Sequence, residues 1–290
     1  MQFSWTKQSQ AKETVQSFLK RQGVSARRLS KLRTKRDYVL LNQQPTTLKH
    51  VVKFNDTVTL CLAKDEDESI IASYQPIQVV YEDDNWIVVD KPAGLTSVPG
   101  PSNQVDTLVN RVKGYLLSQK ITSNPRIITR LDRYTSGLVL LAKNTFVQSL
   151  INQKNLDKRY LAFISGQLTK KSDVIELPLG KREGQIKQEV LANGKPAKTQ
   201  YWVKENFSFG QLLEVKLHTG RTHQIRAHFA HLGHPLIGDE LYGGPQLIDR
   251  QALHASKLIF TDPLTQVTHT FVSELPLDLR NLCTESYLRN

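Results

Sequence analysis

The chain has 290 residues, 39% of them hydrophobic, which is enough to build a packed core in one large or two smaller domains. No apolar run approaches the roughly 18 residues of a membrane-spanning helix, and the first residues lack the pattern of a secretory signal. We therefore expect a cytoplasmic protein with no membrane partner. Cys61 and Cys283 have no second cysteine nearby, which argues against a disulfide framework or a metal knuckle.

The positive charge of the chain is concentrated near its start. The net charge is +12, and residues 1–64 alone contain 13 Lys and Arg against 3 Asp and Glu, a net charge of +10. A soluble protein can carry a basic surface without a specific partner. An excess packed into the first quarter of the chain is better explained by a face that binds a polyanion such as a nucleic acid.

The first segment is typical of a compact α+β module. Val15, Phe18 and Leu19 recur at helical spacing and predict a first helix. Ser25 can cap a second helix over residues 26–32. Basic residues in or just after this second helix are candidate RNA-binding groups: Arg27, Arg28, Lys31 and Arg33.

Two strands complete this module. Apolar runs at residues 38–41 and 58–62 predict the strands, with Gln43 in a turn after the first of them. This order of elements resembles an S4-like RNA-binding domain, although Gln43 and Asn55 stand where that family usually has Gly. The resemblance implies that residues 1–64 form a small domain that binds RNA.

A second, larger domain is expected after a short linker. Residues 65–68 are acidic, and we interpret residues 65–76 as a solvated linker. From residue 77 to residue 290, short apolar runs rich in β-branched residues alternate with short helical patterns. Strands are expected at residues 77–81, 86–89, 138–141, 160–164, 211–217 and 257–260.

A charged loop precedes one of these strands, at residues 130–137. Asp132 follows Arg130 and precedes Arg133, and residues 135–137 supply the turn chemistry before an apolar run. Flanking guanidinium groups favour an ionised carboxylate, which a nucleophile requires. An isolated Asp between two Arg is more often a surface ion pair, so other segments must decide between the two interpretations.

Several segments together resemble the RluA-type family of RNA pseudouridine synthases. The catalytic signature of that family is similar to RLDRYTSG at residues 130–137. Its other motifs are similar to DKPAGL at 90–95, KRYLA at 158–162, GKPAKT at 194–199, GRTHQIR at 220–226 and GHPLIGD at 233–239. Long motifs in one order are far more specific than a single short pattern. Three residues depart from the family pattern without altering a group assigned to catalysis: Val98, Thr129 and Tyr134.

The resemblance implies roles for individual residues. It makes Asp132 the catalytic nucleophile and Arg226 the residue that pairs with it. It implies that Tyr160 stacks on the target base and assists proton transfer, and that Arg130 helps to extrude the target nucleotide. The remaining two basic residues are expected to contact phosphates or to have structural roles: Arg133 and Arg221.

The segment around Arg226 also predicts a helix from its own pattern. Thr222 is placed to cap it and Gly233 to end it. A partly buried Arg beside the apolar stripe of such a helix needs an anionic partner. The stripe is expected to consist of Ile225, Phe229 and Leu232.

We expect neither a metal nor a cofactor. The histidines near this helix do not have the spacing of a His-Glu-x-x-His site, and no Gly-x-Gly-x-x-Gly or phosphate-loop pattern occurs. Conversion of uridine to pseudouridine breaks the N1–C1′ bond and rejoins the base through C5, so no atoms are gained. The target uridine must be extruded or already single-stranded, because a paired base cannot be reached.

The resemblance also implies a fold and a substrate. The fold is α+β, with a mixed, largely antiparallel sheet, flanking helices and a central catalytic cleft. The substrate is structured RNA, either ribosomal RNA, which we favour, or transfer RNA. We expect the protein to act as a monomer.

Two alternatives explain part of the sequence. A non-catalytic RNA-binding or ribosome-assembly protein accounts for the basic first segment but not for a complete set of catalytic motifs. A carboxylate-dependent hydrolase normally needs two carboxylates facing one bond, and only Asp132 lies in a suggestive loop.

Overall fold

The computed structural model describes residues 1–32, 37–63, 70–152 and 155–285. It forms two compact units, Met1–Ser69 with Asn144–Leu150 and Ile70–Lys143 with Ile151–Asn290. Within the described stretches, no helix is long and apolar enough to cross a membrane.

The first unit contains two short helices and two small sheets. Strands β1 (Gln2–Thr6), β6 (Thr57–Cys61), β3 (Tyr38–Leu41) and β4 (Gln44–Pro45) form a sheet in this order. Strands β2 (Glu13–Thr14) and β5 (Val51–Val52) form a separate pair. The helices are α1 (Val15–Arg21) and α2 (Ala26–Lys31).

Both helices begin at side-chain caps. The hydroxyl of Ser25 accepts a hydrogen bond from the backbone N–H of Arg28 at 3.2 Å, as the sequence predicts, and Thr14 accepts one from Ser17 at 3.2 Å. Helix α1 buries its predicted apolar stripe of Val15, Phe18 and Leu19.

The two residues that replace glycine adopt the backbone conformation that glycine would favour. Gln43 has a φ of 68° and Asn55 a φ of 65°, in the left-handed region that costs other residues about 1–2 kcal/mol. Asp56 fixes the second turn, because its carboxylate accepts hydrogen bonds from Asn42 Nδ2 at 2.8 Å and from the backbone N–H of Lys53 at 2.7 Å. Local contacts thus preserve the turns without glycine.

A helix from the middle of the chain belongs to the first unit. Helix α4 (Thr145–Leu150) places Phe146 against Phe3, with ring centroids 4.5 Å apart. Phe146 is only 1% exposed. The N-terminal segment therefore shares its core with a segment that follows β10 of the second unit.

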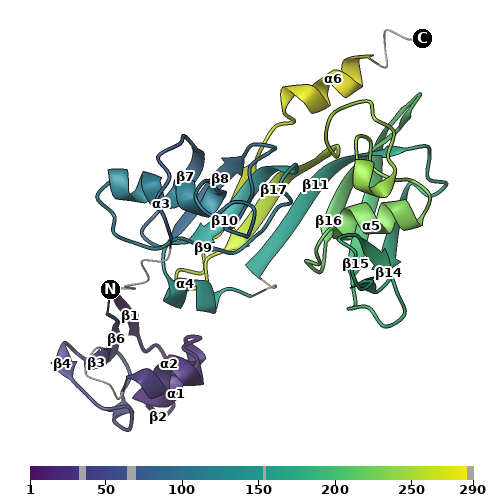
Figure 1. The fold of residues 1–290 in the computed structure, drawn as a ribbon. Coiled ribbons are helices and arrows are strands. Elements are labelled where there is room, and N and C mark those ends of the chain that lie inside the picture. The colour runs from purple at the N-terminus through teal and green to yellow at the C-terminus, as the bar shows by residue number, and fades with distance from the viewer. Residues whose placement is uncertain (33–36, 64–69, 153–154, 286–290) are drawn as a thin grey trace. The chain divides into compact units, whose positions relative to one another are not determined.

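The second unit is built on a ten-stranded sheet (Figure 1). Its main path runs β12 (Ser172–Glu176), β15 (Lys198–Phe207), β16 (Gly210–Leu217), β11 (Leu156–Ser165), β17 (Leu253–Thr261), β10 (Ser136–Ala142), β8 (Trp86–Lys91) and β7 (Gln78–Glu82). Strand β18 (Thr268–Val272) pairs with β17, and β9 (Arg126–Ile127) pairs with β10. The β10–β17 pairing is parallel and the others are antiparallel, so the predicted mixed, largely antiparallel sheet is confirmed.

Helices and a hairpin complete the second unit. Helix α3 (Leu108–Ser118) lies by β7 and β8, and helix α5 (Gln224–His231) lies by β15 and β16 (Figure 1). The other elements are the hairpin β13 (Leu179–Lys181) with β14 (Gln188–Val190), the 3-10 helix η2 (Glu240–Tyr242) and helix α6 (Leu277–Glu285).

Strand β11 separates two hydrophobic cores. Tyr160, Ala162 and Ile164 alternate along the strand and join the core that contains the buried residues of α3 and α5. Phe163 points to the opposite face, into a core that includes Leu279 of α6. The strand therefore presents Tyr160 on the side of the sheet where α5 packs.

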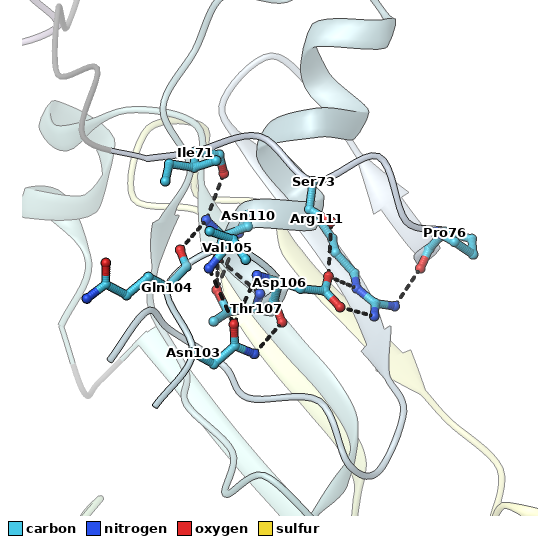
Figure 2. A network of polar contacts seen from close by, with 10 residues as sticks. All are labelled: Ile71, Ser73, Pro76, Asn103, Gln104, Val105, Asp106, Thr107, Asn110 and Arg111. Carbon is cyan, nitrogen blue, oxygen red and sulfur yellow. Dashed lines mark hydrogen bonds and ion pairs between the residues drawn. The ribbon is translucent and has the colours of Figure 1, made fainter. Parts of the chain in front are cut away.

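The chain before β7 is bound to the start of helix α3 (Figure 2). Thr107 and Asn110 form a capping box, and Asn110 Nδ2 also donates to the carbonyl of Ile71 at 2.7 Å. A Cβ at Gly114 would lie 2.0 Å from the carbonyl oxygen of Ser73, so only glycine allows this approach. The last part of the segment interpreted as a linker is therefore held against α3.

Candidate active site

Asp132 lies in the loop between β9 and β10, held by the turn that the sequence predicts. The backbone N–H of Thr135 donates to the carbonyl of Asp132 at 3.1 Å. Gly137 has a φ of 111°, and a Cβ there would lie 2.4 Å from the carbonyl oxygen of Ala255 in β17. Glycine therefore allows β10 to pair closely with β17, which fixes the end of the Asp132 loop.

Arg226 of α5 lies between two carboxylates. Its Nη1 donates to Asp132 Oδ2 at 3.0 Å. Its Nε and Nη2 donate to the two oxygens of Asp239 at 2.7 and 2.8 Å, a bidentate pair. The Arg226 side chain is 8% exposed and Asp239 is 1% exposed. Burial opposes the positive charge, but Asp239 and Asp132 together raise the pKa of Arg226 above its ordinary value.

Tyr242 of η2 connects this ion pair to the β13–β14 hairpin. The Arg226 guanidinium lies 5.1 Å from the centroid of the Tyr242 ring. The Tyr242 hydroxyl accepts a hydrogen bond from the backbone N–H of Gln188 and donates one to its carbonyl, both at 3.0 Å. One tyrosine thus supports the Arg226 side chain and fixes the second strand of the hairpin.

His223 is the second nitrogen-bearing side chain beside Asp132. Its Nε2 lies 3.8 Å from Asp132 Oδ2, and its Nδ1 lies 3.3 Å from the Tyr242 hydroxyl. Burial lowers the pKa of His223 more than the nearby Asp132 raises it. The residue has a φ of 53°, a conformation that non-glycine residues adopt mainly where other contacts impose it.

The opposite side of the Asp132 loop is held by donors to main-chain carbonyls. Lys91, which is fully buried, donates to the carbonyls of Pro92, Leu95 and Arg133 at 2.9, 2.9 and 3.0 Å. Burial lowers the pKa of Lys91 to about 7. Ser97 Oγ donates to the carbonyl of Leu131 at 2.6 Å.

Arg250 binds the same loop one residue further on. Its Nη1 donates to the carbonyl of Tyr134 at 3.1 Å, and its Nη2 donates to Asp278 of α6 at 3.0 Å. The carbonyls of the three residues that surround or follow Asp132 in the loop therefore each accept a side-chain hydrogen bond: Leu131, Arg133 and Tyr134.

Tyr160 points from β11 toward the same place. The side chain is 6% exposed, and its hydroxyl makes no hydrogen bond to any residue that the structure describes. Burial first, and then the charge of Asp132, raise the pKa of Tyr160 well above its ordinary value. The phenol therefore keeps its proton at neutral pH and faces a space beside Asp132.

A small cavity unites most of the predicted site residues. It measures about 60 Å³, and its charged and aromatic lining consists of Arg130, Asp132, Tyr160, Arg221, His223 and Arg226. Arg130 and Arg221 are exposed at its edge. Arg133 is not part of the lining, because its Nε donates to the carbonyl of Gly94 at 3.0 Å and its guanidinium lies over the ring of Tyr134.

The basic residues predicted in the first unit differ in their contacts. Arg27 is exposed on α2, whereas Arg28 pairs with Asp37 at 3.5 Å and donates to Thr145 at 3.4 Å. Lys31 ends α2, and Arg33 lies outside the described residues.

Two details of the α5 prediction are wrong. The helix is not capped by Thr222. It begins after His223, and the Gln224 side chain instead accepts a hydrogen bond from the backbone N–H of Arg221 at 3.0 Å. Leu232 is 40% exposed, because the helix ends before it and its side chain leaves the buried stripe. Ile225 and Phe229 are buried as predicted.

Sequence reasoning missed several residues that build the site. Asp239, His223, Tyr242 and Lys91 all lie within or next to the motif stretches, but nothing in a linear pattern indicates their contacts. The signal for Asp239 was available in principle, since a buried Arg between two carboxylates needs a second acid on a neighbouring element.

Comparison with known proteins identifies the class to which this site belongs. Residues 85–231 match the family model described as RNA pseudouridylate synthase. The chain is 33% identical over 276 residues to the uncharacterized RNA pseudouridine synthase YjbO of Bacillus subtilis, covering 93% of this chain and 98% of the relative. It is 36% identical over 262 residues to the ribosomal large subunit pseudouridine synthase D of Nitrosomonas europaea, covering 84% of this chain and 75% of the relative.

Solved structures agree in fold. The human RNA pseudouridylate synthase domain containing 4 superimposes with a TM-score of 0.60 at 22% identity, covering 72% of this chain and 93% of that one. The human RNA pseudouridylate synthase domain containing 1 superimposes with a TM-score of 0.57 at 24% identity, covering 71% of this chain and 86% of that one. The chain belongs to the RNA pseudouridylate synthase family, whose members are isomerases that act on RNA.

Proposed function

We propose that Asp132 is the nucleophile with which this pseudouridine synthase isomerises uridines of large-subunit ribosomal RNA. One observation carries the proposal. The Asp132 carboxylate accepts a charge-assisted hydrogen bond from Arg226 at 3.0 Å and lines a cavity shared with the aromatic ring of Tyr160. A reactive carboxylate and a platform for a planar base are thus adjacent.

The reaction requires a charged group that can act at the ribose. The uridine N1–C1′ bond breaks, the uracil turns, and a C5–C1′ bond forms. The proton on C5 is released and N1 gains one, so the net change is an isomerisation. Asp132 either attacks the sugar or stabilises positive charge that develops on it, and both routes need the carboxylate in its ionised form.

Arg226 serves as a positioning residue for that carboxylate. Because Asp239 binds two nitrogens of its guanidinium, the third, Nη1, is fixed in direction toward Asp132. A pre-oriented donor lowers the cost of holding the carboxylate against the sugar. Asp239 also balances the charge of Arg226, so that Asp132 is not its sole counter-charge.

Tyr160 provides the surface on which the base is held. Stacking on an aromatic side chain contributes about 1–3 kcal/mol per base and tolerates rotation of the base in its own plane. The detached uracil must stay bound while it turns, and a buried ring meets this need. The raised pKa of Tyr160 makes the phenol a poor proton acceptor at neutral pH.

The site must widen before a nucleotide enters. The cavity volume of about 60 Å³ is well below the roughly 300–1,000 Å³ of typical ligand pockets. Arg130 and Arg221 are exposed at its edge, so their movement opens the cavity without disturbing the buried Arg226–Asp239 pair. This agrees with a role of Arg130 in extruding the target nucleotide.

The choice of ribosomal RNA rests on charge and on relatives. Residues 1–64 carry a net charge of +10, which favours a large folded RNA over a small substrate. The relative from Nitrosomonas europaea is named as a synthase of the large ribosomal subunit. Transfer RNA is the alternative that the experiment must separate.

The test compares Asp132→Asn with the wild-type protein. The variant keeps the size of the side chain and removes its charge, and we expect loss of pseudouridine formation by at least 1,000-fold, a change typical of removing an essential nucleophile. Pseudouridines are mapped in ribosomal and transfer RNA from a deletion strain complemented with each form. Asp173→Asn, at an exposed carboxylate paired with Lys170, is the matched control.

Each outcome of this test has a clear meaning. Pseudouridine formation by the Asp132→Asn protein at the wild-type rate refutes the nucleophile assignment. Restoration of sites in transfer RNA alone refutes the ribosomal substrate. Restored growth or ribosome assembly without any pseudouridine supports a non-catalytic RNA-binding role.

A further inference from the structure

Lys158, which is partly buried, differs from the buried cations of the second unit. Each of the others has carboxylate or carbonyl partners: Lys91, Lys143, Arg226 and Arg250. Lys158 makes no hydrogen bond or ion pair with any residue that the structure describes, although its side chain is partly buried. Burial lowers the pKa of Lys158, and no neighbouring charge opposes that effect.

The position of Lys158 connects it to the candidate active site. It precedes Tyr160 by two residues on β11, so both side chains lie on the same face of the sheet. The neighbouring Asp157 and Arg159 point to the other face, where they pair with each other at 2.8 Å. The ammonium of Lys158 lies 3.6 Å from the point that a Cβ of Gly220 would occupy.

The turn that Lys158 approaches borders two hollows. Arg221, next to Gly220, lines the cavity that contains Asp132. Arg221 also lines a larger hollow of about 860 Å³ at the β13–β14 hairpin. Basic side chains predominate in the lining of that hollow: Lys181, Arg182, Lys195 and Arg221, against the single acid Glu183. The local field therefore favours an anion in that hollow.

A cation that is partly removed from water and has no partner is stabilised when an anion joins it. A long lysine can also be buried only because its methylene groups pack, with its charged end reaching water. Here the charged end lies beside Gly220, and the next residue, Arg221, lines both hollows. These features favour a binding role over simple packing.

We propose that Lys158 binds a phosphate of the RNA backbone beside the target nucleotide and thereby positions that nucleotide over Tyr160. The proposal rests on the proposed function, because it needs an RNA substrate at the Asp132 cavity. Lys158 is then a substrate-binding residue that contacts phosphate and takes no part in the chemical step. Its ammonium acts as a single charge, which suits one phosphate oxygen.

The experiment uses Lys158→Met in the full chain, with a transcript of large-subunit ribosomal RNA as the probe. Methionine keeps the length of the side chain and removes its charge. We expect RNA affinity to fall about tenfold, as for the loss of one hydrogen bond to a charged group. The slope of log Kd against log salt should fall by about 0.7–0.9, the value for one phosphate contact. Lys158→Arg should retain most of the affinity and the slope.

Lys257→Met is the matched control. Lys257 pairs with Arg159 across β11 and β17, so it lies one residue from Lys158 but on the opposite face, and it is exposed. The Lys257→Met variant also removes one positive charge from this sheet, and it should leave the slope of log Kd against log salt unchanged. The melting temperature of Lys158→Met should match or exceed that of the wild type, because a partly buried charge without a described partner has been removed.

The outcomes separate this proposal from the proposed function. Wild-type affinity and salt slope in Lys158→Met overturn the phosphate contact, whatever the activity of Asp132→Asn. A lower melting temperature with an unchanged salt slope shows a packing role and also overturns it. A reduced slope together with unimpaired activity of Asp132→Asn supports the phosphate contact while refuting the nucleophile.

Discussion

The Asp132 loop is held from two sides, and the two sides use different interactions. On the α5 side, Arg226 joins Asp132 to Asp239, so charge is balanced by charge. On the β8 side, Lys91 donates only to carbonyl oxygens, including that of Arg133 in the loop. The α5 side orients the carboxylate that we propose as the nucleophile. The β8 side fixes the backbone that carries Asp132, and Lys91 does so without a hydrogen bond to a carboxylate of the described residues.

This difference has a physical reason. A buried ion pair is worth little in net stability, but removing one partner leaves an uncompensated charge that costs several kcal/mol. A lysine bonded to carbonyls can lose its proton and still keep two hydrogen bonds. The α5 side should therefore be sensitive to any change of charge, and the β8 side should be sensitive to pH.

The largest effect is expected from Arg226→Met. Asp239, 1% exposed, would lose both of its guanidinium hydrogen bonds. The free energy of unfolding should fall by about 3–5 kcal/mol, and activity should be lost. Denaturant unfolding measures the change in the free energy of unfolding, and pseudouridine mapping measures the loss of activity. Arg226→Lys keeps the positive charge but not the planar guanidinium. Its stability and activity should lie between those of the wild type and Arg226→Met. A methionine variant as stable as the wild type would disprove the charge-balance argument.

Lys91→Met should have a smaller effect that changes with pH. Burial lowers the pKa of Lys91 from 10.5 to about 7. Below about pH 7 the Lys91 amine is charged in both the folded and the unfolded chain, so folding carries the full free-energy cost of burying that charge. Between about pH 7 and 10.5 the unfolded chain holds the proton more often than the folded protein, so wild-type stability rises with pH through this window.

The measurement for Lys91 is denaturant unfolding at pH 6 and pH 9. The variant leaves three carbonyls without their donor, so we expect it to be less stable by about 1–3 kcal/mol at pH 9. The difference should be smaller at pH 6, where the wild type bears the cost of the buried charge. A difference that is the same at both pH values contradicts the prediction.

Tyr242→Phe should have the smallest effect. The ring over Arg226 remains, whereas the hydroxyl that binds the backbone of Gln188 and contacts His223 Nδ1 at 3.3 Å is lost. We expect a loss of about 1 kcal/mol in the free energy of unfolding, with Asp132 still paired to Arg226. Hydrogen exchange of the β13–β14 hairpin should increase while that of α5 is unchanged. Faster exchange in α5 would show that the hydroxyl also supports the α5 side of the loop.

Local patterns predicted the elements of the fold better than their ends. The strand at residues 38–41, the Ser25 cap and the apolar run within β10 are all set by residues close together in sequence. The start of α5 was mispredicted because His223, with a left-handed backbone, occupies the N-cap position and no side chain caps the helix there. The inclusion of α4 in the first unit could not be predicted, because it depends on Phe146 packing against Phe3.

The sequence by itself determined the class of protein, the loop that carries Asp132 and the row of alternating residues that contains Tyr160. These follow from motif order and from the period of a strand, which are local properties. Only the tertiary structure decided which charges meet. Asp239 balances Arg226, Lys91 holds three carbonyls, and Lys158 has no partner among the described residues, because these contacts depend on segments whose distance in space no linear spacing records.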